Sequence, residues 1–320
     1  MAHIKPSKLL RYEIWSSCDY RCRFCCWENS GMAGIRPAPL SRQTLSRLCR
    51  ALAATGCHNL NLTGGEPLLM PEAELCESVN AISSETAIKQ LWATTNGAAL
   101  RDIAYCRRIA GAGLKQLAVS VAAETDEKYR LYSGTEITLT DILGGIRNAI
   151  SCGMDVRAHI PLNPVGVSRF SELERLLRKL EDVGVRTAFF FRLHNSEKIC
   201  KEYSSLYISP SSIIREMEKS PDWQYAESGA GRPSYTDGIM TVHIPRERIA
   251  LATGNCIEQN CGDYCQGIYS AYLVPNQSGW HIRACHRVFV DGRNEYPFDP
   301  EADEAEMASL LQKVWRYAYE

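Results

Sequence analysis

The chain has 320 residues, of which 45% are hydrophobic, so it is long enough for one large domain and a small second one. Its formal net charge of −1 gives no electrostatic reason to expect nucleic acid or an anionic membrane surface as a partner. The N-terminus has no signal-peptide core and no apolar run is long enough to span a bilayer, so we expect a cytoplasmic protein.

Six β–α repeats occupy residues 9–193, and their strands are almost continuously apolar. Such strands form a parallel sheet covered by helices, which closes or partly closes into a barrel. We therefore expect an α/β fold with a partial (β/α)6 barrel of the TIM type, whose active site lies at the C-terminal strand ends. The expected strands are Leu9–Trp15, Asn59–Thr63, Gln90–Thr95, Gln116–Val121, Val156–Leu162 and Thr187–Leu193. The expected helices are Ser41–Ala54, Glu72–Ile82, Asp102–Ala110, one around Ile142–Ala149, and one that Ser171 caps with Glu174 in a capping box.

The pattern changes after residue 195, which predicts three parts with boundaries at 1–195, 196–255 and 256–320. The middle part is polar and predicts a linker or elaborated loops with one short helix near Ser211–Lys219. The last part predicts a β-hairpin of Tyr269–Val274 and Trp280–Ala284, followed by a helix near Ala302–Tyr317.

The fourteen cysteines form two clusters plus scattered single residues. Disulfide scaffolds are typical of short secreted chains, so clustered cysteines in a reducing compartment favour metal binding. The single cysteines lie within or beside apolar stretches and are expected to be small buried hydrophobes. They are Cys49, Cys57, Cys76, Cys106, Cys152 and Cys200.

The first cluster follows the first strand, where Cys18, Cys22 and Cys25 have the spacing Cys-x3-Cys-x2-Cys. Three thiolates on one loop can hold three irons of a [4Fe–4S] cluster and leave the fourth iron open to a small molecule. A zinc knuckle is the alternative, with Cys26 as a fourth ligand. Zinc sites usually use two close pairs of ligands, however, and neighbouring cysteines rarely both reach one ion.

A second motif, Thr63–Pro67, has the sequence Thr-Gly-Gly-Glu-Pro at the end of the next strand. Gly64 and Gly65 would let backbone carbonyls approach the ammonium group of a ligand, and Glu66 would add negative charge there. Phe24 can lie against an adenine ring. The two motifs together indicate reductive cleavage of S-adenosylmethionine to form a carbon radical.

These motifs, with Thr95–Gly97 and Val119–Val121, resemble the radical S-adenosylmethionine (SAM) superfamily. The stretch Leu62–Leu69 most resembles the branch of the molybdenum-cofactor GTP 3′,8-cyclase. The resemblance implies a [4Fe–4S] cluster, SAM, a 5′-deoxyadenosyl radical and an electron donor such as flavodoxin or ferredoxin. It also implies that Ser120 and Arg157 contact SAM, although Arg157 has an alternative interpretation as a charge at the barrel rim. The implied cofactor-binding residues are Phe24, Gly64, Gly65, Glu66, Asn96, Ser120 and Arg157.

The second cluster flanks the predicted hairpin and contains Cys261, Cys265 and Cys285. It resembles the auxiliary [4Fe–4S] domain of this branch, of the twitch or SPASM type, and a structural zinc ribbon is the alternative. Cys256 has three interpretations. It is a fourth ligand, a catalytic thiol that donates a hydrogen atom, or a buried loop cysteine.

The resemblance to the cyclase fails where that enzyme uses arginines for the GTP triphosphate, since we find Ser17 and Gln266–Tyr269 at those positions. The first strand also starts too early for a leader-peptide domain. We therefore expect a small-molecule substrate in a biosynthetic pathway: a sugar, nucleoside, aminoglycoside or amino-acid derivative that undergoes oxidation, epimerisation, rearrangement or carbon–carbon bond formation. A peptide-modifying enzyme is the alternative, followed by the GTP cyclase and a non-catalytic zinc scaffold. The residues expected to line the substrate pocket are Tyr12, Glu13, Trp27, His159, Asn163, Arg192 and His194.

Overall fold

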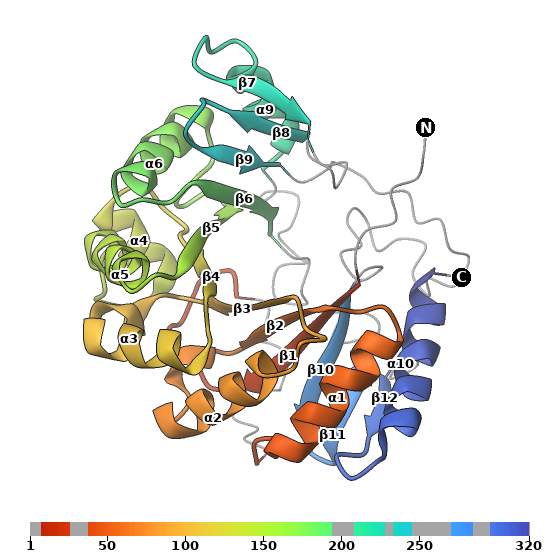
Figure 1. The fold of residues 1–320 in the computed structure, drawn as a ribbon. Coiled ribbons are helices and arrows are strands. Elements are labelled where there is room, and N and C mark those ends of the chain that lie inside the picture. Colours follow the sequence, from red (N-terminus) through yellow and green to blue (C-terminus); the bar gives the residue numbers. More distant parts are fainter. Residues whose placement is uncertain are drawn as a thin grey trace.

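The computed structural model describes residues 8–25, 38–193, 208–227, 233–244, 270–283 and 295–319. Their strands form one twelve-stranded sheet in the order β12-β11-β10-β1-β2-β3-β4-β5-β6-β9-β8-β7. The sheet curves without joining its two ends within the described residues (Figure 1), which confirms a partial barrel. Six parallel strands form its centre: β1 Leu9–Trp15, β2 Asn59–Gly64, β3 Gln90–Thr95, β4 Gln116–Ser120, β5 Asp155–Leu162 and β6 Thr187–Arg192.

Helices cover the outer face of these strands (Figure 1), and the main core lies between the two layers. Alternate strand residues such as Leu60, Leu117 and Ile160 are fully buried against the helices, as period-two patterning requires. Most helices begin and end within two residues of the sequence prediction, whereas α4 was not predicted. The helices are α1 Arg42–Ala54, α2 Glu72–Ser83, α3 Ile103–Ala112, α4 Asp126–Ser133, α5 Leu139–Ser151 and α6 Phe170–Asp182, with 3-10 turns at η1 Pro67–Leu69 and η2 Ala98–Arg101.

The capping prediction for α6 was wrong by two residues. The helix begins at Phe170, so Ser171 lies inside it, and the residue at the third helical position is Glu172. The Glu172 carboxylate accepts hydrogen bonds from the backbone N–H groups of Ser168 and Arg169, at 2.9 and 3.2 Å. An acidic residue at this position satisfies amide groups that the first helical turn leaves without partners.

The part predicted as a linker contributes three strands to the sheet. Helix α9, Pro210–Met217, agrees with the predicted short helix. Strands β7 Gln224–Glu227, β8 Pro233–Thr236 and β9 Thr241–His243 follow, and β9 pairs in parallel with β6. The sequence did not predict these strands because they are short and rich in polar residues, and their buried residues within the described part are only Ser234, Tyr235 and Val242.

The C-terminal part continues the same sheet at the other end. The predicted hairpin is present as β10 Ser270–Asn276 and β11 Gly279–Arg283, followed by β12 Glu295–Phe298 and α10 Glu304–Tyr319. Strand β10 pairs in parallel with β1. The division at residues 195 and 255 stays a prediction, although described strands from all three parts join one sheet.

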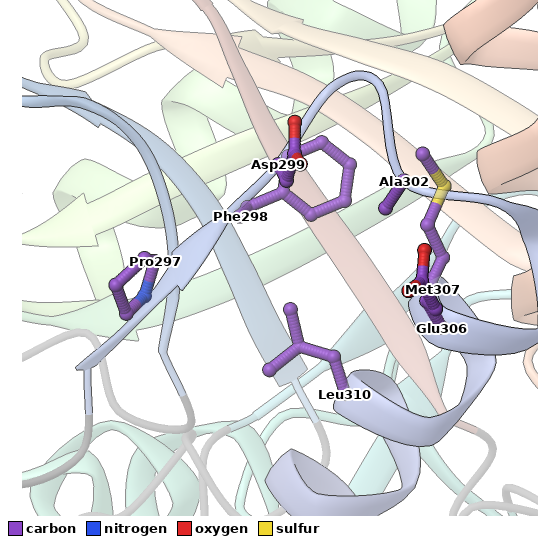
Figure 2. A pocket seen from close by; sticks show the side chains of 7 residues that line it. All are labelled: Pro297, Phe298, Asp299, Ala302, Glu306, Met307 and Leu310. Atoms are coloured by element: carbon purple, nitrogen blue, oxygen red, sulfur yellow. The ribbon is translucent and has the colours of Figure 1, made fainter.

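Helix α10 packs on α1 through specific polar contacts. The indole N–H of Trp315 donates to the Thr55 hydroxyl at 3.1 Å, and Arg50 pairs with Glu304 at 2.7 Å. Between β12 and α10 lies a shallow groove of about 240 Å³ (Figure 2), lined in part by Phe298 and Leu310. No helix within the described residues is long and apolar enough to cross a membrane.

Candidate active site

The cysteine loop follows β1 at the C-terminal edge of the parallel strands. Cys18 is exposed, whereas Cys22 and Cys25 are partly buried. The loop is fixed to the end of α4, because the backbone N–H groups of Arg21 and Arg23 donate to the carbonyl groups of Ser133 and Tyr132, at 3.0 and 2.8 Å. The unpredicted helix α4 therefore supports the predicted cluster loop.

The Gly-Gly-Glu-Pro turn after β2 packs directly on the segment that leads into this loop. The N–H of Gly65 donates to the Trp15 carbonyl and the N–H of Glu66 donates to the Ser17 carbonyl, both at 2.8 Å. A Cβ at Gly64 would lie 2.2 Å from the Trp15 oxygen, and one at Gly65 would lie 2.4 Å from the Ser17 oxygen. The glycines are required for this close backbone packing, and the expected contact of their carbonyls with a ligand stays a prediction.

Glu66 joins this turn to the turn after β3. Its carboxylate is 3% exposed and accepts hydrogen bonds from the Leu68 amide at 2.9 Å, the Thr95 hydroxyl at 2.6 Å and the Asn96 amide at 2.6 Å. Burial raises the pKa of Glu66 to about 7, against the lowering effect of these hydrogen bonds. Most of the hydrogen-bonding capacity of Glu66 is therefore used inside the protein.

Asn96 extends the same turn to the cysteine loop. Its side-chain Nδ2 lies 2.8 Å from Asp19 Oδ1 and 4.0 Å from Cys18 Sγ. Phe24, on the loop itself, is 8% exposed and its ring centroid lies 5.9 Å from that of Tyr132. The structure thus places Phe24 within the cysteine loop and holds Asn96, through Glu66, beside Cys18.

The three cysteines fit a [4Fe–4S] cluster, whereas Cys26, the fourth ligand of the zinc alternative, lies outside the described residues. Within the described ranges no group of three or more cysteine, histidine or acidic side chains is arranged to hold one metal ion. Cys18, Cys22 and Cys25 would each bind a different iron of a cluster, so their sulfur atoms need not meet at one point. If such a cluster is bound, the same three ligands would leave one iron without a protein donor.

The loops after β4 and β5 form a second fixed part of the site. Ser120, the last residue of β4, is in register with His159 on β5. The Asn163 amide donates to the carbonyls of Ala122 and Pro161, both at 2.9 Å, and its Oδ1 accepts from the Gly166 amide at 2.7 Å. Asn163 is fully buried, so it holds these two loops together and does not line a pocket.

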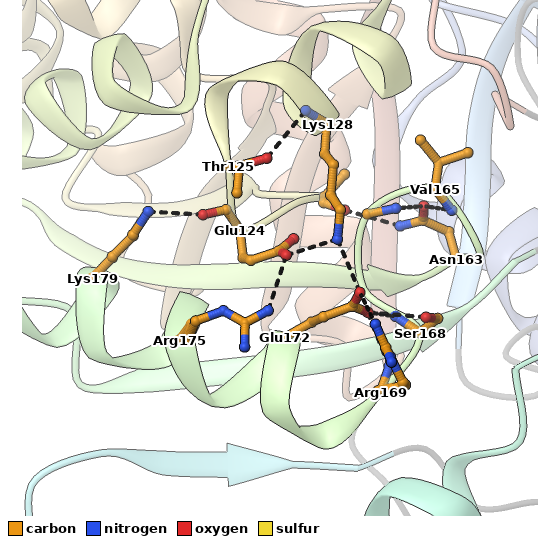
Figure 3. A network of polar contacts seen from close by, with 12 residues as sticks. Glu124, Thr125, Lys128, Asn163, Val165, Ser168, Arg169, Glu172, Arg175 and Lys179 are labelled. Atoms are coloured by element: carbon orange, nitrogen blue, oxygen red, sulfur yellow. Dashed lines mark hydrogen bonds and ion pairs between the residues drawn. The ribbon is translucent and has the colours of Figure 1, made fainter.

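An ion-pair network lies behind these loops (Figure 3). Lys128 on α4 bridges two carboxylates, that of Glu124 at 2.7 Å and that of Glu172 at 2.9 Å. Both acids are at most 4% exposed, and Glu124 also pairs with Arg175 on α6 at 3.3 Å. The network connects the loop after β4 to the start of α6, and Lys179 adds a hydrogen bond to the Glu124 carbonyl at 2.8 Å.

Arg157 lies on the concave face of the sheet, the face opposite the helices. Its guanidinium lies 4.5 Å from the ring centroid of Trp92 and 5.7 Å from that of Phe189. It is in register with Ala118, two residues before Ser120 along the strand direction. Arg157 is therefore deeper in the barrel than Ser120, and its contact with SAM stays a prediction.

Arg11 is a concave-face residue that the sequence interpretation missed. It donates to Asn61 Oδ1 at 3.1 Å and lies 5.9 Å from the Tyr272 ring centroid. Among the described residues neither Arg11 nor Arg157 forms an ion pair, although the Asp155 carboxylate acts electrostatically on Arg157, and the Nε atom of each arginine is buried without a hydrogen bond there. The alternation of β1, which places Arg11 on the same face as Glu13, could have identified it.

The other pocket candidates divide between the two faces. Tyr12 faces the helices and packs on Trp280 at 5.4 Å, so it is a core residue. Glu13 faces the concave side, 3.5 Å from the Arg283 guanidinium, and burial raises the pKa of Glu13 to about 8. The His159 ring centroid lies 4.6 Å from that of Phe191. The candidates outside the described residues are Trp27, His194, Cys256, Cys261, Cys265 and Cys285, together with the side chain of Arg192, and their roles stay predictions.

A partial barrel with three closely spaced cysteines after its first strand, and a Gly-Gly-Glu-Pro turn packed on their loop, defines a class of iron–sulfur enzyme with one open iron. The family model described as "Radical SAM superfamily" matches residues 12–180. The chain belongs to this superfamily, whose enzymes use a [4Fe–4S] cluster and SAM.

Curated relatives include proteins named GTP 3′,8-cyclase. The protein of Bradyrhizobium diazoefficiens is 33% identical over 171 residues, 52% of this chain and 46% of that protein. The Aquifex aeolicus protein is 29% identical over 218 residues, 67% of this chain and 65% of that protein. The matches therefore cover less than two thirds of either relative.

The solved structure of Streptococcus suis SuiB bound to the precursor peptide SuiA aligns with 97% of this chain and 64% of that chain. Its TM-score is 0.63 and its sequence identity is 14%, so the likeness is one of fold.

Proposed function

We propose that this protein generates a 5′-deoxyadenosyl radical from SAM and uses it to abstract hydrogen from a small-molecule substrate. The cysteine loop carries this proposal, because it is fixed by the Gly-Gly-Glu turn, by Asn96 and by the end of α4. When bound there, a [4Fe–4S] cluster supplies the single electron that cleaves SAM. The chain holds the three thiolates in place at the edge of the sheet where a barrel of parallel strands binds its ligands.

The concave face supports a substrate with an anionic group and a planar or apolar part. Arg11 and Arg157 offer guanidinium groups that form no ion pair within the described residues, and guanidinium groups favour carboxylate or phosphate. Trp92 and Phe189 beside Arg157 offer flat apolar surface. Among the expected classes, this composition favours a nucleoside, sugar or amino-acid derivative with an acidic group over a polycationic aminoglycoside.

Arg11 adds a cation to the concave face that could bind a phosphorylated substrate. The expectation of a less charged substrate rests on Ser17 and Gln266–Tyr269, where the cyclase resemblance requires arginine. Two arginines on the concave face can still recognise one anionic group, though they are fewer than the set that the resemblance assigns to a triphosphate. We therefore keep GTP cyclisation as a less favoured alternative.

The second cysteine cluster is proposed to bind an auxiliary [4Fe–4S] cluster through Cys261, Cys265 and Cys285, with Cys256 as a fourth ligand or a hydrogen donor. A flavodoxin or ferredoxin is the proposed electron donor. Anaerobically reconstituted protein should then contain about eight irons per chain.

The decisive assay is formation of 5′-deoxyadenosine from SAM by reconstituted protein under dithionite. The triple substitution of Cys18, Cys22 and Cys25 by alanine should abolish the product and remove about half of the iron. Cys76→Ala is the matched control, because Cys76 lies on α2 outside both clusters and should leave activity and iron content unchanged. Wild-type protein that holds iron but forms no 5′-deoxyadenosine would refute the proposal.

Deuterated candidate substrates then identify the reacting molecule, because abstraction transfers deuterium into 5′-deoxyadenosine. Transfer from an anionic small molecule supports the proposed substrate class. Transfer from a peptide alone would replace it with the peptide-modifying alternative.

A further inference from the structure

The structure assigns Asn96 and Asp19 a role in setting the reduction potential of the cluster at Cys18. This inference rests on the proposed function, since it requires a cluster on the loop. It concerns two side chains that lie beside Cys18 and belong to different turns. Asn96 follows β3 and Asp19 follows Cys18 in the loop itself.

The orientation of the Asn96 amide is fixed by its own hydrogen bonds. Its Oδ1 accepts from the Ala98 backbone N–H at 2.9 Å, so its Nδ2 must point away from Ala98. The backbone N–H of Asn96 donates to Glu66 Oε2 at 2.6 Å, which holds the whole turn. The two Nδ2 protons are therefore presented to Asp19 Oδ1 at 2.8 Å and to Cys18 Sγ at 4.0 Å.

Each side chain acts on the charge of the cluster in a known direction. A reduced cluster carries one more negative charge, so a hydrogen-bond donor at a coordinating sulfur stabilises it and raises its reduction potential. A carboxylate next to the same sulfur destabilises the reduced cluster by like-charge repulsion. Asn96 donates both to the sulfur and to the carboxylate, so it raises the potential twice, directly and by offsetting the charge of Asp19.

Backbone donors to Cys18 support the same environment. The Tyr20 N–H lies 3.4 Å from Cys18 Sγ, within hydrogen-bond distance for sulfur. Asn96 is therefore a hydrogen-bond donor to Cys18 from outside the cysteine loop. Its effect on the cluster can be removed by substitution without changing the sequence of the loop.

The test is the midpoint potential of the reconstituted protein without SAM, measured by redox titration with detection of the reduced cluster by electron paramagnetic resonance. The signal that changes when SAM is added identifies the cluster on this loop and separates it from an auxiliary cluster. Asn96→Ala should shift the midpoint to more negative potential, by a change of about tenfold in the equilibrium constant, or ~59 mV for one electron. Asp19→Asn should shift it to more positive potential.

Asn80→Ala is the matched control, because Asn80 is exposed on α2 and should leave the potential unchanged. If Asn96→Ala and Asp19→Asn both retain iron and have the same midpoint potential as Asn80→Ala, the inference is wrong. If Asn96→Ala loses the cluster, Asp19→Asn decides: a positive shift supports the inference and no shift overturns it. Weakened SAM binding by Asn96→Ala with an unchanged SAM-free potential would also overturn it, in favour of a direct contact between Asn96 and SAM.

The proposed function fails in a different way. Wild-type protein whose signal does not respond to SAM, or whose loop binds no iron, refutes the cluster site itself.

Discussion

Glu172→Gln should destabilise the protein and weaken the connection between the loops after β4 and β5. Glu172 is 4% exposed and accepts hydrogen bonds from Lys128 Nζ at 2.9 Å and from the backbone and side chain of Ser168, both at 2.9 Å. Burial alone would raise its pKa, but these hydrogen bonds outweigh burial and lower the pKa of Glu172 to about 2. Glutamine keeps the size of the side chain and removes the charge on which the pairing depends.

The expected loss of stability follows from the difference between the pKa values of Glu172 in the folded and unfolded states. A fall from 4.5 to about 2 corresponds to about 3 kcal/mol at neutral pH, at 1.36 kcal/mol per pKa unit. Because the folded pKa is lowered, this stability is complete above the unfolded pKa and is lost as pH falls toward the folded value. At pH 3 about 1 kcal/mol should remain.

Chemical unfolding followed by circular dichroism at pH 7, 5 and 3 measures this effect. Glu174→Gln on the same helical turn is the matched control, since Glu174 is the residue that the sequence pattern favoured and it has no described role in the cap. The Glu172 variant should lose stability at pH 7 and approach wild type at pH 3, while the Glu174 variant should follow wild type throughout. An equal loss in both variants, or a loss from Glu172→Gln that does not shrink with acid, would refute the reasoning.

Three further predictions concern other parts of the fold. Gly65→Ala should displace the cysteine loop and sharply reduce bound iron with the fold retained by circular dichroism, whereas Gly111→Ala, with open space around its Cβ, should change neither. Trp315→Ala should lower the free energy of unfolding by about 3–5 kcal/mol, because a buried indole that joins α10 to α1 is lost. Chemical unfolding measures this change, and a loss of stability near zero would contradict the prediction. Burial raises the pKa of Glu13 to about 8 despite the nearby Arg283. The stability that protonated Glu13 contributes is therefore complete below pH 4.5 and is lost as pH rises through 8. The melting temperature of wild type should therefore fall more between pH 6 and pH 9 than that of Glu13→Gln, and parallel curves would count against it.

The barrel strands could be predicted from the sequence because each is a short apolar run that ends at a polar or glycine-rich turn. Strands β1 and β3 have the predicted bounds, and β2 and β4 differ by one residue. Helix α4 escaped prediction because its buried side is small: within it only Tyr129 and Ser133 are buried. The strands β7–β9 escaped because they are short and only a few of their side chains are buried, so they lack the continuous apolar pattern of the central strands.

The sequence predicted which polar residues lie at the candidate site, whereas the ligand contacts assigned to them stay predictions. The sequence identified Glu66, Asn96 and Asn163 as functional candidates, and the structure places all three at the C-terminal strand edge. Their hydrogen bonds, however, go mainly to other parts of the chain. A pattern in a sequence shows that a polar side chain is needed at a strand end, but only coordinates show whether a ligand or the backbone uses it.

Gly64 and Gly65 show how far this difference changes the interpretation of a motif. Without side chains they allow β2 to pack its turn on residues 15–17, so the position of Cys18 depends on a turn that lies about forty residues further along the chain. Glu66 then transmits the same constraint to Asn96, whose amide reaches back to the loop. The motif and the cysteines are thus parts of one hydrogen-bonded unit, and a substitution in the turn should reach the cluster through the backbone even where it never touches SAM.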